Sequence, residues 1–240
     1  VLRAFNIDDK LVRFNAYANN FVYDLQNNLK QTTVYDSAVN FNHKDNLGAV
    51  VYSTASADNT QLGYISSSND TKHESRYGFT LETDVVFPKF IRSVDQFDRN
   101  FTNVSLFGIH SASADSADTT ILDPSIFVFA DRDEVYSKNV RFRLSSSLLS
   151  NPLTSSNFLG IYNDQQWNFS VRLRPDTFGI SEVAGLTPSN YVLEFSGYSQ
   201  VIGDIRENFS VTANVSSGDA SNLLKSSKRL CVGAQRQNLT

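Results

Sequence analysis

The chain has 240 residues, of which 40% are hydrophobic and 19% charged, and a formal net charge of −4. That length suits one large all-β domain or two small ones. The mild negative charge argues against nucleic-acid binding, which requires a basic surface. No apolar run approaches the roughly 18 residues that a membrane-spanning helix needs, which argues against membrane insertion. The single cysteine, Cys231, excludes an internal disulfide and is expected to be a small buried apolar side chain.

Residues 1–46 differ from the rest of the chain and are predicted to form an N-terminal arm or linker. Asparagine is frequent in this region. Phe21, Leu25 and Leu29 lie four residues apart, a spacing that favours a short helix within 16–30, although asparagine lowers helix propensity. Because the sequence does not begin with methionine, we expect it to be part of a longer polypeptide.

Residues 47–240 are predicted to form one antiparallel β-sandwich. Segments such as 79–87 and 140–144 alternate between apolar and polar residues, which is typical of strands with one buried face. All five prolines fall at strand ends or in polar loops, where a missing N–H costs little. Many short strands without a long helical period indicate an all-β fold. The predicted strands are 49–54, 62–66, 78–87, 104–109, 126–130, 140–144, 167–173, 191–195, 209–215 and 229–232, and the predicted loops include 66–72, 111–120, 145–157 and 216–221.

The most informative of these strands follows a polar turn and begins at Trp167, the only tryptophan. After it, Phe169, Val171 and Leu173 alternate with polar residues. Large aromatic side chains dominate protein cores, so we expect Trp167 to be buried rather than to form a sugar-stacking platform.

The order of the segments resembles a laminin-G-like (concanavalin A-like) jelly-roll domain. The segments that carry the resemblance are YGFTLETDVVFP, SLFGIH, FVFADRDE, VRFRLSS, YNDQQWNFSVRLRP, YVLEFSGYS and KRLCVGAQRQNLT. More narrowly, NDQQWNFSVRLRP, IRENFSVTA and SSKRLCVGAQRQNLT are similar to laminin-G-like segments of large virion structural proteins of marine tailed phages. The resemblance implies a jelly-roll sandwich in which a further strand follows Gly233–Arg236, so that residues 47–240 would lack the last strand.

Catalytic residues are not evident in the sequence, and we do not expect an enzyme. Glycosidases of the same fold place two carboxylates on one strand, but no Glu-x-Asp-x-x-Glu pattern occurs. The nearest approach is Asp131, Asp133 and Glu134, which we interpret as part of a solvated loop. Three isolated histidines and the lack of a Gly-x-Ser-x-Gly motif supply no catalytic triad.

Calcium is the one cofactor for which the sequence offers candidate ligands. Domains of the resembled family often hold Ca²⁺ at the sandwich rim, and hard cations prefer carboxylate and carbonyl oxygens. The candidate ligands are Asp115 and Asp118 in the loop 111–120, together with Asp131 and Asp133. Their spacing matches no ligand pair of the family, so the interpretation as solvated loop residues is favoured. One cysteine and scattered histidines cannot compose a four-ligand zinc site.

Two pairs of arginines are the candidate ligand-binding residues. Arg141 and Arg143 point to one side of their predicted strand, and Arg172 and Arg174 to one side of theirs. If the two strands are neighbours, four guanidinium groups share one outer face, which suits carboxylates, phosphates or sulfated sugars. The alternative, which we favour, is a solvated face on which these arginines pair with nearby carboxylates.

The resemblance implies a non-enzymatic structural or adhesion domain of a virion protein of the capsid, neck or tail. Its partners would be other virion subunits or further copies of itself, and its location the virion. The first alternative is a carbohydrate-binding module of a secreted or surface protein that binds glycans outside the cell, and the second is a glycosidase of the same fold.

Overall fold

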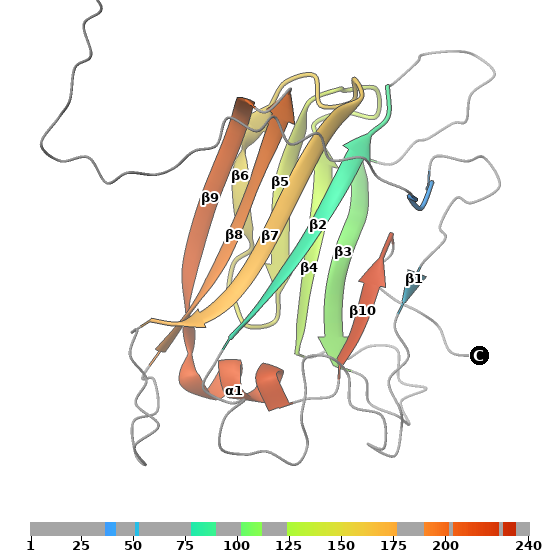
Figure 1. The fold of residues 1–240 in the computed structure, drawn as a ribbon. Helices are drawn as coiled ribbons and strands as arrows, with labels where there is room; N and C mark the ends of the chain where they lie inside the picture. The colour runs from blue at the N-terminus through green and yellow to red at the C-terminus, as the bar shows by residue number, and fades with distance from the viewer. Residues whose placement is uncertain are drawn as a thin grey trace, which may run out of the picture. The chain divides into compact units, whose positions relative to one another are not determined.

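The computed structural model describes residues 37–41, 51–52, 78–89, 102–111, 124–176, 190–201, 204–225 and 228–233. Within them the chain forms two antiparallel β-sheets and one short helix (Figure 1). The predicted all-β antiparallel sandwich is therefore confirmed. The elements are β1 (Val51–Tyr52), β2 (Phe79–Phe87), β3 (Asn103–Ser111), β4 (Ser125–Arg132), β5 (Val140–Ser146), β6 (Leu153–Phe158), β7 (Gln165–Pro175), β8 (Asn190–Val201), β9 (Asp204–Ser216), α1 (Ser217–Lys225) and β10 (Lys228–Val232).

The two sheets differ in size and strand order. The six-stranded sheet has the order β1-β10-β3-β4-β5-β6, and the four-stranded sheet has the order β2-β7-β8-β9. Every neighbouring pair is antiparallel. Between these strands the chain thus changes sheet four times, at β1 to β2, at β2 to β3, at β6 to β7 and at β9 to β10, and the buried faces of both sheets form one shared core.

Strand β7 shows how the sequence pattern produces this core. Trp167, Phe169, Val171 and Leu173 are all fully buried, and the residues between them point outward. The prediction that Trp167 packs in the core is therefore confirmed. Its indole Nε1 donates a hydrogen bond to Gln165 Oε1 (3.1 Å), so the one polar atom of the ring has a partner.

Strand β4 is buried on both faces. Val128 and Ala130 face the core, while Phe127 and Phe129 point away from it and are nevertheless buried. The guanidinium of Arg143 lies 4.3 Å from the centroid of the Phe129 ring and covers it. Burial on both faces explains why this segment reads as a continuous apolar run instead of an alternating one.

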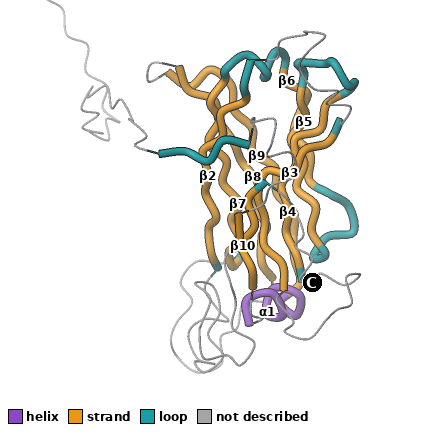
Figure 2. The backbone as a smooth tube through the Cα atoms, turned by 90° about the vertical axis from the view of Figure 1, so that its right-hand side faces the viewer, coloured by secondary structure: helices purple, strands orange, loops and turns teal. Residues whose placement is uncertain are grey.

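Helix α1 closes one end of the sandwich, at the bottom of Figure 2. Ser216 caps it, because its Oγ accepts a hydrogen bond from the Asp219 backbone N–H (3.1 Å). Ala220, Leu223 and Leu224 are buried and belong to the core. The prediction of a loop at 216–221 was wrong, because the Ser-x-x-Asp capping signal before an apolar stripe outweighs the local Ser and Gly content.

Strand β6 also corrects the prediction of a loop at 145–157. It is the edge strand of its sheet, so few of its side chains need to be apolar, and only Ser155 and Phe158 are buried. The register between β5 and β6 shifts between Arg141 and Arg143. At this irregularity the Phe142 N–H donates to Ser155 Oγ (2.9 Å), so a side chain replaces a backbone acceptor.

Several predictions fall partly or wholly outside the described residues. These are the N-terminal arm at 1–46, apart from 37–41, the helix within 16–30, the strand at 62–66 and the further strand after 233. Of the predicted strand 49–54, only β1 is described, and it pairs with β10. Among the helices of the described residues, none has the length and apolar character that crossing a membrane requires.

Candidate binding surface

The structure separates the two arginine pairs. Arg141 and Arg143 lie on β5 of the six-stranded sheet, and Arg172 and Arg174 lie on β7 of the four-stranded sheet. On both strands the residues between the arginines are buried in the core, so the two pairs point outward from opposite faces of the sandwich. The hypothesis of four guanidinium groups on one face is therefore wrong, because it required β5 and β7 to be neighbours.

The guanidinium of Arg143 is held by neighbouring side chains of β4. Its Nε and Nη2 donate to the two oxygens of Asp131 (2.5 and 3.1 Å), and its guanidinium stacks on Phe129. Asp131 also accepts a hydrogen bond from Asn103 Nδ2 (2.6 Å). Asp131 belongs to β4 rather than to a loop, which corrects the sequence interpretation. An adjacent guanidinium and an amide donor occupy this carboxylate, an arrangement that disfavours a second cation such as Ca²⁺.

The remaining candidate calcium ligands are not brought together in the described residues. Asp133 lies in the loop after β4 and accepts a hydrogen bond from Asn157 Nδ2 (2.6 Å). Asp115 and Asp118 lie outside the described residues. In the part of the chain that the structure describes, no three His, Cys, Asp or Glu side chains are grouped closely enough to hold a metal ion. Calcium binding therefore stays a prediction.

The outer face of the four-stranded sheet, here called the polar face, is the candidate binding surface. Its side chains are mainly hydroxyls, amides and charged groups, and neighbouring strands hold them in cross-strand rows. From the α1 end upward, the rows are Thr80, Arg172, Glu194 and Thr212; then Glu82, Ser170, Ser196 and Ser210; then Asp84, Asn168, Tyr198 and Asn208.

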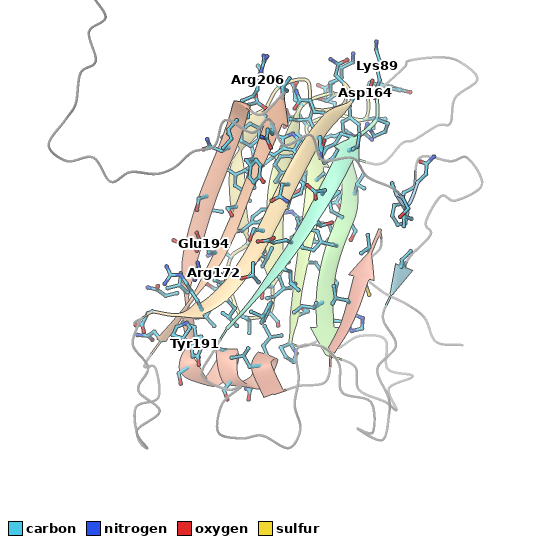
Figure 3. All side chains as sticks on the ribbon, in the orientation of Figure 1. Lys89, Asp164, Arg172, Tyr191, Glu194 and Arg206 are labelled. Carbon is cyan, nitrogen blue, oxygen red and sulfur yellow. The ribbon has the colours of Figure 1, made fainter. Side chains whose placement is uncertain are left out.

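Charged side chains mark one border of the polar face. Arg174 Nε lies 3.6 Å from Glu194 Oε2, so this pair is a weak, partly exposed ion pair. Arg172 lies directly opposite Glu194 in the register, and both are labelled in Figure 3. Arg172 is exposed and makes no ion pair within the described residues, so its guanidinium can contact a ligand.

Aromatic and amide side chains form the next border, beyond the row of three serines. Tyr198 is 38% exposed, although the other tyrosine of β8, Tyr191, is buried. Asn168 Nδ2 donates to Asp84 Oδ1 (3.2 Å), which orients this amide beside the tyrosine. Sequence reasoning did not single out these residues. The alternation YVLEFSGYS already places Tyr198 on the outward side, opposite in phase to Tyr191, Leu193 and Phe195.

Glu207 on β9 faces the interior near one end of the four-stranded sheet. It lies opposite the buried Ser199, and its Oε2 is buried without a hydrogen-bond partner among the described groups. Burial raises the pKa of the Glu207 carboxyl above its usual value. The folded state therefore holds a proton on this carboxyl at pH values where the unfolded chain has released it.

Replacing Glu207 with glutamine is expected to stabilise the protein at neutral pH. A raised folded-state pKa means that the carboxyl weakens folding increasingly as pH rises through the unfolded value of about 4.5 and then the folded pKa. The gain in stability should therefore be full at pH 7 and vanish at pH values well below 4.5. Urea unfolding of both proteins between pH 3 and 8 measures it. A variant less stable than the parent at pH 7 would contradict the assignment.

Comparison with known proteins gives no family. No family model matches the chain, and neither a curated protein nor a solved structure matches it.

Proposed function

We propose that this chain is a non-enzymatic attachment domain that uses the polar face of its four-stranded sheet to bind its partner. The observation that carries the proposal is the composition of this face. Over four strands it presents exposed hydroxyls and amides, an exposed tyrosine and the guanidinium of Arg172. Such a surface offers many donors and acceptors around an aromatic side chain, and tyrosine and arginine are enriched among the residues that dominate binding energy.

The placement of the acidic residues supports the non-enzymatic part of the proposal. Glycosidases of this architecture need two carboxylates free to act as acid and nucleophile or base. Asp131, the strand residue of the acidic segment, is bound by Arg143 and Asn103, and Asp133 is bound by Asn157. Two of the three carboxylates of that segment thus already have protein donors.

We place this attachment domain in a virion, as a structural or adhesion part of the capsid, neck or tail, because of its resemblance to laminin-G-like segments of phage structural proteins. The partner would then be another structural subunit. Mass spectrometry of purified particles should detect the chain, and cross-linking should join Lys or carboxylate side chains near the polar face to a second particle protein. Particles that lack the chain would refute this placement.

A carbohydrate-binding module is the second candidate, and the row of Tyr198, Asn168 and Asn208 favours it. An exposed aromatic ring can stack on a pyranose, and flanking amides supply the polar groups that fix its orientation. This row lies next to Ser170, Ser196 and Ser210, whose small side chains leave the tyrosine ring accessible from that side.

A glycan array with the intact chain distinguishes the two candidates. If the polar face binds sugars, Tyr198→Ala and Asn208→Ala should each weaken binding by roughly tenfold, equivalent to about 1.4 kcal/mol. Arg141→Ala, an exposed residue on the opposite face of the sandwich, is the matched control and should bind normally. An array without saturable binding favours a protein partner. Equal losses in all three variants would contradict the assignment to the polar face.

A further inference from the structure

Exposed apolar side chains gather at the end of the sandwich opposite helix α1, here called the loop end. Five large apolar residues there are at least 40% exposed: Val86 (58%), Tyr136 (56%), Leu159 (69%), Val201 (40%) and Ile205 (60%). Of the other three exposed large apolar residues in the described part of the chain, Tyr198 lies on the polar face, and Val39 and Val51 lie before β2.

The topology brings these five residues to one end. Strands β2, β4, β6 and β8 all finish there, and β5, β7 and β9 begin there. Hydrogen bonds tie the segments together. The Lys89 N–H donates to Asp164 Oδ1 (2.8 Å), and the Gly160 N–H donates to Asn139 Oδ1 (3.2 Å). Figure 3 labels Lys89, Asp164 and Arg206 at this end, above the ends of the strands.

At the opposite end of the sandwich, apolar side chains are buried rather than exposed. Helix α1 covers that end and buries Ala220, Leu223 and Leu224 completely or almost completely. Single exposed apolar residues are ordinary on a protein surface, but a group of them confined to one end marks an interaction surface. The uneven distribution between the two ends therefore points to a partner at the loop end.

The charges at the loop end indicate which partner fits. Within the described residues of this end, exposed cations and exposed acids lie together around the apolar side chains: Lys89, Lys138, Arg141, Arg206, Asp133, Glu134 and Asp164. A membrane surface with anionic lipids or a nucleic acid would select a surface of largely positive charge, whereas this set carries both signs. A two-fold axis brings the same patch of two copies together, so a patch that carries both signs can pair its cations with the acids of the other copy.

We propose that the loop end is a self-association surface whose occupant is a second copy of this chain. In a two-fold arrangement, the apolar side chains of Leu159 and Ile205 contact the same end of the partner, and cations of one copy face acids of the other. Val86 lies on the outer face of β2, beside the polar face, but no side chain of the three rows of the polar face takes part in this contact. Self-association can therefore be tested separately from the proposed attachment function.

Sedimentation equilibrium of the intact chain over a wide concentration range tests the proposal. The parent protein should change from the mass of one copy to that of two. Leu159→Ser combined with Ile205→Ser should raise the dissociation constant at least tenfold, and both residues are exposed, so the fold should be retained. Val51→Ser, which removes an exposed apolar side chain from the edge strand β1, is the matched control and should associate like the parent. Circular dichroism melting checks that all three proteins are folded.

A charge-exchange experiment adds a readout that a general loss of apolar surface cannot mimic. Lys138→Glu and Glu134→Lys should each weaken self-association, and mixing the two variants should restore it, because opposite charges again face each other across the contact.

A parent protein that stays monomeric at every concentration would overturn the proposal. Association that the double serine variant leaves unchanged would overturn it too, as would binding of the monomer to anionic phospholipid vesicles through Leu159 and Ile205.

Discussion

Replacing Phe142 with alanine is expected to lower the free energy of unfolding by about 3–5 kcal/mol, the range measured for large aromatic side chains removed from cores. Phe142 is fully buried on β5 of the six-stranded sheet. Its ring centroid lies 4.8 Å from that of Trp167 and 4.7 Å from that of Phe169, both on β7 of the other sheet. It also contacts the rings of Phe87, Phe158 and Phe209 (5.7–5.8 Å between centroids).

The size of the effect follows from this position between the sheets. Among the described residues, Phe142 is the one whose ring contacts aromatic side chains of β2, β6, β7 and β9 at once, and alanine would remove that ring. Interiors are close-packed, so the surrounding rings can fill only part of the cavity. Equilibrium urea unfolding measures the change. Phe142→Leu, which keeps most of the volume, should cost clearly less, and Tyr198→Ala on the polar face should cost little. A loss below about 1 kcal/mol for Phe142→Ala would contradict the central role of this ring.

Much of the fold can be predicted from local patterns, and the core strands show why. In β2, β5 and β7 one face meets the core and the other meets solvent, so the residues alternate visibly. The buried state of Trp167 and Cys231 also follows from sequence, because both lie within apolar, strand-like segments. The fold class can thus be predicted from sequence, because the alternation of apolar and polar residues within each strand already shows which face is buried.

The order of the strands in the sheets cannot be predicted from such local patterns, and the prediction that β5 and β7 are neighbours was wrong. The outward position of Arg141, Arg143, Arg172 and Arg174 on their strands was correct, but a strand does not encode which strand lies beside it. The separation of the two arginine pairs depends on β6 and β7 belonging to different sheets, so that the chain crosses over between them. That crossover depends on packing across the whole core, which no single segment specifies.

The two missed elements show the limits of composition as a guide. Strand β6 is rich in Ser, Thr and Asn because an edge strand buries few side chains, and helix α1 is short and begins with Ser, Gly and Asp. In both, tertiary contacts select the structure: Ser155 supplies a hydrogen bond to β5, and Leu223 packs into the core. The candidate binding surface was missed for a related reason, since Tyr198 and Asn208 become neighbours only through the pairing of β8 with β9.

Replacing Gly108 with valine is expected to destabilise the protein by about 3 kcal/mol, the upper end of the range typical of overpacked cores. Gly108 lies on β3 opposite Phe127 of β4. A Cβ atom at this position would lie 2.3 Å from Phe127 Cδ1 and 2.5 Å from the backbone oxygen of Ile126. The ring could rotate away, but the carbonyl belongs to the sheet ladder and cannot move without breaking the pairing of β3 with β4.

The direction in which Gly108→Ala changes the free energy of unfolding tests this close approach most directly. In an ordinary strand, exchanging glycine for alanine stabilises by roughly 0.5–1 kcal/mol, because glycine loses more conformational freedom on folding. At Gly108 the contact with the Ile126 carbonyl should make the same exchange destabilising instead. Gly218→Ala in helix α1, where the nearest atom would lie 3.8 Å from the new Cβ, is the matched control and should stabilise.

A double variant separates the two contacts at Gly108. Phe127→Leu removes the ring that the new Cβ would meet, but it leaves the Ile126 carbonyl in place. If the backbone contact dominates, Gly108→Ala should destabilise by a similar amount in the Phe127→Leu background and in the parent. If the ring dominates, the double variant should be more stable than the sum of the two single changes predicts. Urea unfolding of the four proteins decides between these outcomes, and a neutral or stabilising Gly108→Ala would show that β3 and β4 do not approach this closely.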